Sequence, residues 1–196
     1  MTQKEYKKRF VDIIVDAFAN NPSVSDVVKQ DHKKDARIRK LAEYSFEFGK
    51  RRNGLYMSTD GNGIVIYYVE NMKRTLWDHL ADLKLILTVS GLSKARYLLR
   101  KEAYRNSVRP KEPFFYVWFL GIDSAHRGTN TIRELKNKVF EEADRLQLPT
   151  LLETTIEQNK RVYERFGFRV YHEHEYREGM PTMYYMRKEC TTEPTL

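Results

Sequence analysis

The sequence has a single cysteine among its 196 residues, so no disulfide can form within the chain. Cys190 lies near the C-terminal end, and no second cysteine or clustered histidine accompanies it as a metal ligand. No serine or cysteine stands in a setting that would activate it as a nucleophile. This cysteine usage suits a reducing compartment, and we expect a cytoplasmic protein without a metal site.

Long apolar runs are also lacking. The first residues, MTQKEYKKRF, contain no apolar signal core, and no later stretch approaches transmembrane length, so no membrane partner is expected. The sequence shows no internal repeat and no low-complexity linker, which favours a single domain over residues 1–190. Residues 191–196 have no periodicity and are expected to form a disordered tail.

Positive charge is in excess. The 35 Lys and Arg against 27 Asp and Glu give a formal net charge of +8. Such a chain favours an anionic partner, either nucleic acid or a polyphosphate such as coenzyme A, and net charge does not discriminate between them. The basic residues are scattered through several segments, a pattern typical of solvated helix faces.

The first half of the chain alternates between helical and strand-like patterns. Apolar residues at helical spacing predict helices over 4–19 and 34–52, the first ending where Pro22 disfavours helical geometry in the residue before it. Residues 55–70 predict a β-hairpin, because DGNG accepts the positive φ of a tight turn. Residues 72–109 are again helical in pattern, in two pieces broken near Ser90-Gly91.

The second half has a different order of elements. A nearly unbroken apolar run at 114–122 is typical of a strand buried on both faces. There follow, in order, a helix over 131–146, a strand over 148–155, a short helix over 159–166, and two antiparallel strands over 168–176 and 182–189. The strand–helix–strand order requires two parallel strands with a crossover helix. We therefore predict a mixed α/β (α+β) fold with a central mixed β-sheet, flanking helices and a helical insert.

The polar turn between the first of these strands and the long helix predicts a phosphate site. Its sequence is SAHRGTN, and it lies at the helix N-terminus, where unpaired main-chain N–H groups and a partial positive charge favour anions. Arg127 in the turn and Arg133 just inside the helix add positive charge for a pyrophosphate or a 3′-phosphate.

Three segments together resemble the GNAT superfamily of N-acetyltransferases: FLGIDSAHRGTNTI, LLETT and NKRVYERFGF. The resemblance spans roughly residues 114–188, under half of the chain. It implies the GNAT-like acyl-CoA N-acyltransferase fold and transfer of an acetyl group from acetyl-CoA to a primary amine of an unidentified small molecule or peptide. It also implies direct transfer within a ternary complex.

The resemblance assigns cofactor-binding roles to individual positions. Leu120 and Ile122 would lie on the strand that pairs with the pantetheine arm, as an added strand does. Asn159 would contact the pantetheine or its neighbouring backbone. The pyrophosphate would be held by the main-chain amides of Arg127, Gly128, Thr129, Asn130 and Thr131.

Two catalytic roles are also implied. Tyr163 would give its phenolic proton to the departing CoA thiolate. The attacking amine must be deprotonated, and Glu153, at the end of LLE, is the best-placed carboxylate for that step. Taken alone, a tyrosine on a short helix is more often a packing residue, and Glu153 is equally well interpreted as a solvated charge at a strand end.

The sequence departs from the family pattern in the phosphate loop, where Asn130 and Ile132 replace the two glycines. Asparagine tolerates left-handed geometry better than other non-glycine residues. Ile132 places a branched side chain where the backbone should approach phosphate closely, unless it points into the core. An alternative interpretation is therefore a catalytically degenerate GNAT-fold binding module.

A second alternative is a DNA-binding protein with a helix-turn-helix-like segment near residues 80–105. The sequence LADLKLILTVSGLSKARYLLRK has a helix, a turn and a basic helix, but Leu87 stands where such motifs carry alanine. The second helix also contains Tyr97, Leu98 and Leu99, so we expect much of it to be buried. Nucleic acid is therefore the less favoured partner, to be tested by mutating Lys94 and Arg96.

Other features carry less information. His172 and His174 fall on one face of an expected exposed strand, without further ligands for a metal. Glu47, Glu70 and Glu175 could each attract a cationic acceptor, and nothing in the sequence ranks them. Pairing through the last strands would give a homodimer.

Overall fold

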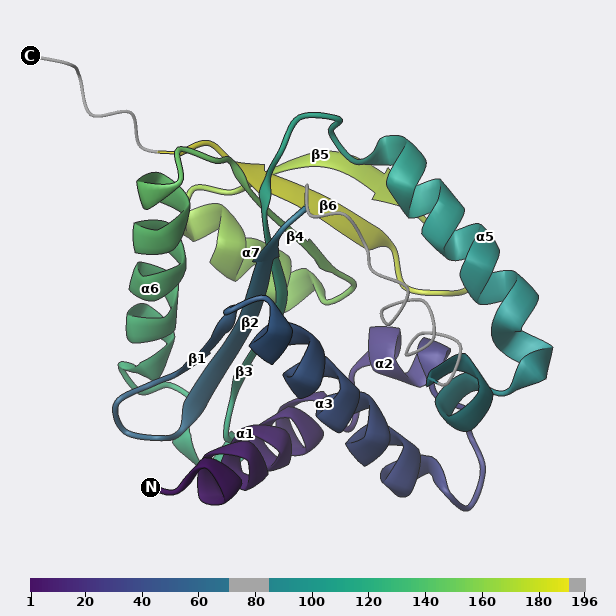
Figure 1. Cartoon of the computed structure of the whole chain (residues 1–196). Helices are drawn as coiled ribbons and strands as arrows, with labels where there is room; N and C mark the ends of the chain where they lie inside the picture. Colours follow the sequence, from purple (N-terminus) through teal and green to yellow (C-terminus); the bar gives the residue numbers. More distant parts are fainter. Residues whose placement is uncertain (71–84, 191–196) are drawn as a thin grey trace, which may run out of the picture.

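A computed structural model describes residues 1–70 and 85–190, so part of the predicted helical insert and the predicted tail lie outside the described residues. The strands form a six-stranded sheet in the order β1-β2-β3-β4-β6-β5 (Figure 1). Their bounds are β1 Leu55–Met57, β2 Gly63–Val69, β3 Phe115–Ile122, β4 Thr150–Thr154, β5 Arg169–His174 and β6 Met183–Lys188.

The sheet is mixed, as predicted. β3 and β4 pair in parallel, and each of the other neighbouring pairs is antiparallel. The parallel pair follows from the crossover through α6, because a helix returns the chain to the end where the first strand began. The predicted hairpin over 55–70 is confirmed as β1 and β2, with Leu55 opposite Ile66.

The described helices surround this sheet. They are α1 Gln3–Phe18, α2 Pro22–Val27, α3 Lys34–Arg51, α5 Leu92–Val108, α6 Thr131–Arg145 and α7 Glu157–Arg165, with a π-helix over Ile86–Ser90 and a 3-10 turn over Ser124–His126. The helices predicted over 4–19, 34–52, 131–146 and 159–166 are confirmed within three residues at each end. The helix α7 ends at Arg165, and Gly167 shortly after it has a φ of 91°, which fits the C-terminal cap expected there.

The helix α2 was missed in the sequence. Pro22 ends the preceding helical pattern, but it also occupies the first turn of α2, where its missing N–H costs nothing. The side chain of Asn21 accepts a hydrogen bond from the Ser23 N–H at 2.9 Å and caps the new helix. The NNPS segment therefore ends one helix and begins another.

Two hydrophobic layers cover the two faces of the sheet. On one face α6 and α7 pack over the strands, and on the other face α1 and α3 do so (Figure 1). The α6 side has a buried core of Val65, Tyr67, Phe115, Val117, Leu135, Val139, Ala143, Leu152, Phe168 and Met186. The α1 and α3 side has Phe10, Val11, Ile13, Ile14, Ala42, Phe46, Ile64, Ile66 and Phe119. β3 contributes to both layers, which agrees with its unbroken apolar sequence.

The helix α5 lies at the margin of the molecule, beyond the edge strand β5 (Figure 1). It begins after Gly91, so the predicted break near Ser90-Gly91 is confirmed. None of its residues is fully buried, and Leu99 is 63% exposed, so the expectation that much of this helix is buried is wrong. The helix is attached instead through its inner side, where Tyr104 stacks on His174 with ring centroids 3.9 Å apart.

Candidate active site

The sheet opens between its two parallel strands. β3 and β4 pair only at Phe115 with Thr150 and at Tyr116 with Leu151. β3 continues to Ile122 and β4 to Thr154, but no other residues of these two described strands pair with each other. The carboxyl half of β3 therefore presents an edge without a neighbour on the β4 side, which an extended ligand can pair with.

A β-bulge lies where the strands part. Ile66 faces Phe119 and Tyr67 faces Val117, so Trp118 is an extra residue in β3. Bulges bend a strand and redirect its peptide groups, and they are frequent next to active sites. Leu120 and Ile122, beyond the bulge, are half-buried against the core on the α6 side.

The loop that follows β3 carries unpaired main-chain donors. The N–H groups of residues 127–132 make no hydrogen bond in the part of the chain that the structure describes. The amides just before them are paired, because Ser124 N–H donates to the Asp16 carboxylate and Ala125 N–H to that of Asp123. A run of free N–H groups that leads into a helix N-terminus is a binding site for an anion such as phosphate.

The backbone of this loop differs from the geometry expected for the family's glycines. Gly128 adopts a φ of 83° with open space around its Cβ position, so the loop's positive φ falls there. Asn130 has a φ of −67° and a ψ of −9°, which any residue can adopt. Asn130 therefore introduces no backbone strain. Ile132 is half-buried and belongs to neither core layer.

Two arginines beside the loop have no acidic partner among the residues that the structure describes. Arg127 and Arg133 are exposed, and neither makes an ion pair or a side-chain hydrogen bond with the described residues. In contrast, Arg145 at the other end of α6 pairs with Glu142 at 2.8 Å. The two free guanidinium groups are available for phosphate oxygens.

Carboxylates hold the β1–β2 turn against the first turn of α6. Thr131 donates its hydroxyl to Asp60 at 2.7 Å, and Glu134 accepts from the Tyr56 hydroxyl and the Thr59 N–H, each at 2.7 Å. Hydrogen bonds from the Ser58 hydroxyl, the Asn62 N–H and Thr131 hold the pKa of Asp60 well below its usual range. These acidic groups occupy one flank of the helix N-terminus, so an anion would approach from the side of Arg127.

Tyr163 and Asn159 lie on α7, which follows β4. The ring of Tyr163 packs against the same core as Leu120 and Ile122, and burial raises the pKa of its phenol to about 12. Its hydroxyl has no partner among the described residues, and neither has the side-chain amide of Asn159. Among the described residues, neither polar group therefore has a protein partner that a ligand would have to displace.

Glu153 is a partner in a buried ion pair. Arg109 donates to its Oε1 from Nη2 at 2.7 Å and from Nε at 3.0 Å, and Arg105 lies 3.6 Å from its Oε2. The Arg109 and Glu153 side chains are 5% and 8% exposed, so the interpretation of Glu153 as a solvated strand-end charge is wrong. The base role stays a prediction, and the two flanking guanidinium groups weigh against it because they occupy the carboxylate oxygens that would accept the proton.

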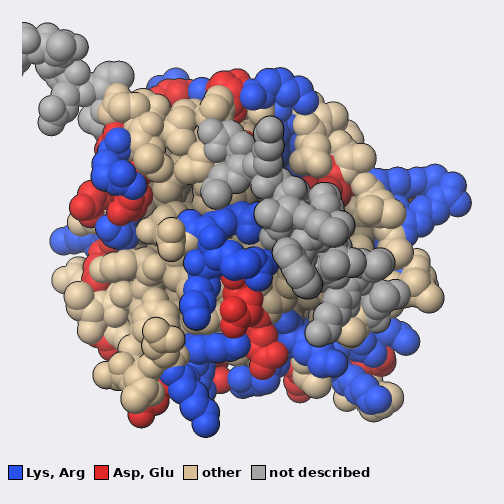
Figure 2. Space-filling model, in the orientation of Figure 1, with Lys and Arg blue, Asp and Glu red and all other residues tan. Residues whose placement is uncertain are grey.

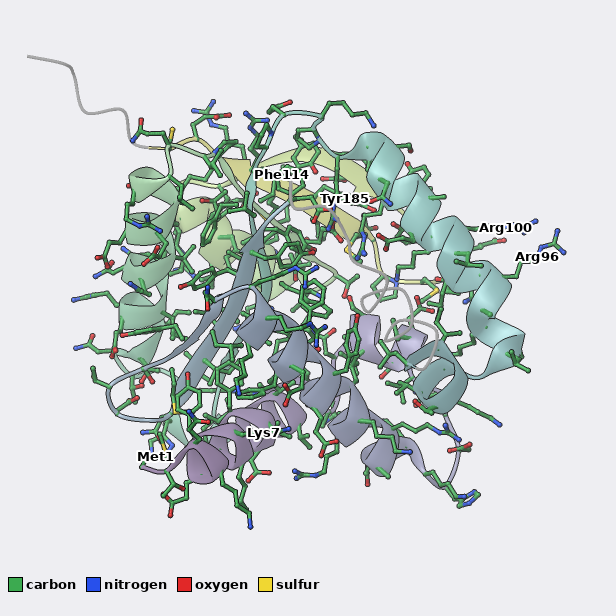
Figure 3. All side chains as sticks on the ribbon, in the orientation of Figure 1. Met1, Lys7, Arg96, Arg100, Phe114 and Tyr185 are labelled. Atoms are coloured by element: carbon green, nitrogen blue, oxygen red, sulfur yellow. The ribbon has the colours of Figure 1, made fainter. Side chains whose placement is uncertain are left out.

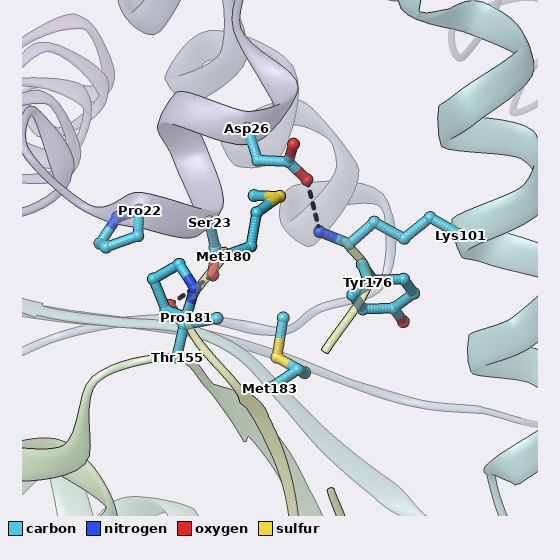
Figure 4. Close-up of a pocket in the computed structure, with 9 residues that line it drawn as sticks. All are labelled: Pro22, Ser23, Asp26, Lys101, Thr155, Tyr176, Met180, Pro181 and Met183. Carbon is cyan, nitrogen blue, oxygen red and sulfur yellow. Dashed lines mark hydrogen bonds and ion pairs between the residues drawn. The ribbon is translucent and has the colours of Figure 1, made fainter. Parts of the chain in front are cut away.

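A small hollow lies at the carboxyl end of β4. It is lined by Pro22, Ser23, Asp26, Lys101, Thr155, Tyr176, Met180, Pro181 and Met183 (Figure 4). The Ser23 and Thr155 hydroxyls are 3.0 Å apart and join α2 to the end of β4. The hollow is small, and it lies where α2, α5, the end of β4 and the segment between β5 and β6 meet.

The remaining sequence candidates lie away from this hollow. Glu47 pairs with Lys7 at 2.6 Å, and Glu70 and Glu175 are exposed residues outside the lining. The structure describes no cluster of three or more metal-binding side chains in residues 1–70 and 85–190. His172 and His174 share one face as predicted, but Tyr104 of α5 covers them, and its hydroxyl lies 2.8 Å from His172 Nε2. The exposed strand expected there is half-covered.

Sequence reasoning missed the residues that shape the hollow. Asp26 and Lys101 are 75 positions apart and meet only because α5 lies against α2. The Arg109–Glu153 pair likewise joins the end of α5 to β4. The only sequence signal for such buried ion pairs is a charged residue inside an apolar pattern. That signal does not identify the residue with which it pairs.

Solved structures with the same arrangement cover nearly the whole chain. A protein from Corynebacterium glutamicum described as histone acetyltransferase HPA2 and related acetyltransferase matches with a TM-score of 0.71 and 22% identity, over 100% of this chain and 96% of its own. The fold is that of the GNAT N-acetyltransferases. Arylalkylamine N-acetyltransferase 2 from Aedes aegypti matches with a TM-score of 0.65 and 18% identity, over 97% of each chain. The polyamine N-acetyltransferase of Drosophila melanogaster matches at 0.58 and 12%, over 96% and 97%. No sequence-family profile matches the chain.

The GNAT fold contains the strand–helix–strand order that the sequence predicted. The described residues of the helix-turn-helix-like segment, 85–105, give little support to the DNA-binding alternative. Lys94 donates to the carbonyl oxygens of Asp26 and Val28, at 2.6 and 3.0 Å, and so ties α5 to α2. Arg96 and Arg100 point away from the body of the protein (Figure 3). On the face in Figure 2, Lys and Arg are interspersed with acidic and uncharged side chains and form no uninterrupted basic field. Among the described residues, no helix is long and apolar enough to cross a membrane.

Proposed function

We propose that the protein transfers an acetyl group from acetyl-CoA to a primary amine. The unpaired N–H groups of residues 127–132, which lead from the open edge of β3 into α6, carry this proposal. They form an anion cradle at the end of a strand edge that can pair with an extended ligand. That combination fits a nucleotide pyrophosphate followed by a pantetheine arm.

The residues present fit acetyl-CoA. Gly128 gives the loop its positive φ without a side chain, and Arg127 and Arg133 supply unpaired positive charge. Arg127, Gly128, Thr129, Asn130 and Thr131 would hold the pyrophosphate, with Leu120 and Ile122 along the pantetheine and Asn159 beside it. The hydroxyls of Thr129 and Thr131 are already paired with neighbours, so these two residues would act through their main-chain amides.

The reaction that we propose joins the amine nitrogen to the acetyl carbon and breaks the carbon–sulfur bond of the thioester. Tyr163 would donate its phenolic proton to the sulfur as that bond breaks, and it remains protonated at neutral pH because its pKa is raised to about 12. The amine loses one proton to water or to a carboxylate. Glu153 stays a candidate for that acceptor, although its ion pair with Arg109 favours a structural role.

Calorimetric titration of acetyl-CoA, followed by an assay of acetyl transfer to a panel of amines, tests the proposal. We expect binding of acetyl-CoA and transfer to at least one amine, and Tyr163→Phe should bind acetyl-CoA but turn over more slowly. Absence of acetyl-CoA binding would overturn the cofactor assignment.

A second function has one specific observation in its favour. Ile132 replaces the second glycine of the family loop, which suits a protein that binds acetyl-CoA or coenzyme A without catalysis. Binding of acetyl-CoA without turnover on any amine would favour this non-catalytic binding module.

Three further proposals depend on the same fold. They are a cytoplasmic location, a homodimer formed through the last strands, and a single domain over 1–190.

A further inference from the structure

The last turn of α1 packs directly on the carboxyl end of β3 (Figure 1). Gly121 makes this contact possible, because a Cβ at this position would lie 3.1 Å from Ala17 Cβ and 3.1 Å from Phe18 Cε2. Ordinary contacts between carbon atoms are about 3.5–4.0 Å, so a larger residue would push the helix away from the strand. The ring of Phe18 also packs edge-on against Phe119, with centroids 4.9 Å apart. The end of α1 is therefore fixed beside the loop that follows β3.

From the last turn of α1, Asp16 reaches the start of this loop. Its carboxylate accepts a hydrogen bond from the Ser124 N–H at 2.6 Å and another from the Ser124 hydroxyl at 3.0 Å. An acidic residue in the last turn of a helix is opposed by the partial negative charge of the helix C-terminus, and no basic residue accompanies Asp16 in that turn. The loop that it holds explains the location of Asp16, whereas the stability of its own helix does not.

Arg9, about two turns earlier on α1, holds the end of β3. Its Nη2 lies 2.9 Å from the Asp123 carboxylate and donates to the Asn62 side chain at 2.8 Å, while its Nε donates to the Gly61 carbonyl oxygen at 2.9 Å. Hydrogen bonds from the Ala125 N–H and from Arg9 hold the pKa of Asp123 below its usual range. The helix α1 thus connects the β1–β2 turn with the residue that follows β3.

The loop between β3 and α6 is therefore held at both ends. Its start is held through Asp16 and Asp123, and its far end is held where Thr131 donates to Asp60 at 2.7 Å. Between these anchors lie the free N–H groups of residues 127–132. Fixing the ends of a short segment reduces the conformations that it can adopt before a ligand binds, and this lowers the entropic cost of binding.

We propose that Asp16 is a positioning residue for acetyl-CoA, which holds the start of the loop through Ser124 and so orders the anion cradle of residues 127–132 before the pyrophosphate binds. This inference rests on the proposed acetyl transfer, because it names a residue that prepares the cofactor site of that reaction. The positioning role is opposite in sign to simple electrostatics. A carboxylate near the cradle repels a pyrophosphate, whereas the same carboxylate favours binding when it fixes the loop.

Two substitutions of Asp16 separate its hydrogen bonds from its charge. Asp16→Ala removes the charge and both hydrogen bonds, and it should weaken acetyl-CoA binding about tenfold, because two hydrogen bonds to a charged group are lost. Asp16→Asn removes the same charge, but its amide can still accept from the Ser124 N–H and donate to the hydroxyl. Its affinity should equal or exceed that of the wild type. Calorimetric titration of acetyl-CoA measures both, and equal or tighter binding by Asp16→Ala, or an equal loss in both variants, would overturn the inference.

Gly121→Ala provides a second route to the same effect, because it displaces the last turn of α1 from β3. Like Asp16→Ala, it should raise the KM for acetyl-CoA and leave the KM for the acetylated amine unchanged. Asp12→Ala is the matched control, since Asp12 lies one turn earlier on α1 and pairs with Lys8 and Arg39 at 2.8 and 2.9 Å. It should leave the affinity for acetyl-CoA unchanged. A loss in Asp12→Ala as large as that in Asp16→Ala would attribute the effect to the stability of α1 and contradict the positioning role.

Hydrogen exchange in the free protein tests the anchor without a ligand. The Ser124 and Ala125 amides should exchange faster in Asp16→Ala than in the wild type and in Asp16→Asn, and unchanged exchange would overturn the inference. If the wild type does not bind acetyl-CoA, the proposed function fails, and titration of inorganic pyrophosphate still reports on the loop. Weaker pyrophosphate binding by Asp16→Ala than by the wild type then supports the inference. Equal binding, or no binding by either protein, overturns it.

Discussion

Arg109 donates two hydrogen bonds to one oxygen of Glu153, at 2.7 and 3.0 Å, and so joins the residue that follows α5 to the carboxyl end of β4. Both side chains are nearly inaccessible, and the guanidinium also lies 4.3 Å from the Tyr116 ring centroid. A buried charge that loses its partner is strongly destabilising. This pair therefore attaches the marginal helix to the sheet.

Glu153→Gln should lower the free energy of unfolding by about 3–5 kcal/mol, because it leaves the Arg109 charge buried without a counter-charge. Urea denaturation measures this. Glu47→Gln, in an exposed pair with Lys7, is the matched control and should cost less than about 1 kcal/mol. A Glu153→Gln protein of unchanged stability but without activity would instead support Glu153 as the base.

Tyr163→Phe should lower kcat for acetyl transfer by about 10²-fold or more, since general acid catalysis contributes that much when the acid is positioned. Affinity for acetyl-CoA should change little, because the ring keeps its packing against Phe168. The raised pKa of about 12 predicts that no loss of the acid is seen up to about pH 10. Steady-state kinetics from pH 6 to pH 10 check both points, and an unchanged kcat in Tyr163→Phe would show that another group protonates the thiolate.

Arg127→Gln and Arg133→Gln should each weaken acetyl-CoA binding about tenfold, because a hydrogen bond to a charged group contributes about 1.5–3 kcal/mol. The loss should shrink as salt is raised, since exposed charges are screened. Arg145→Gln, at the far end of α6, controls for net charge. Equal weakening by all three variants would indicate a general charge effect and contradict the assigned cradle.

Asp60→Asn should lower stability at pH 7, and the difference from the wild type should narrow as the pH falls below about 4. The hydrogen bonds from Ser58, Asn62 and Thr131 lower the folded-state pKa of Asp60, so its contribution is complete above the unfolded pKa and is lost as the pH falls toward the folded value. Thermal unfolding from pH 7 to pH 2 measures the gap. Thr131→Val removes one of the three donors, so its stability should differ from that of the wild type by less than that of Asp60→Asn does. A stability difference for Asp60→Asn that does not change with pH would show that the ionised form of Asp60 does not stabilise the fold.

Much of the fold was predictable because its signals are local. The apolar run at 114–122, the helical periodicity of 131–146 and the DGNG turn each depend on neighbours within a few residues, and the strand–helix–strand order then requires a parallel pair. The phosphate loop followed from the same logic, since a helix N-terminus after a strand presents its amides in any sequence. The sequence shows that Asn130 and Ile132 stand where the family pattern has glycine, but it does not show the backbone angles at these positions.

Only the tertiary structure decided which charges meet. Asp26 and Lys101, or Arg109 and Glu153, are far apart in the sequence, and their pairing depends on where α5 lies against α2 and β4. Helix periodicity indicates that a face is apolar but not which element covers it. For that reason the sequence suggested burial of much of α5, whereas Leu99 is exposed. The sequence by itself thus predicted the mixed sheet with its parallel pair and the run of main-chain amides at the start of α6, because local patterns indicate both. The docking of α5 determined which charges meet at the small hollow at the end of β4, because long-range packing alone brings those side chains together.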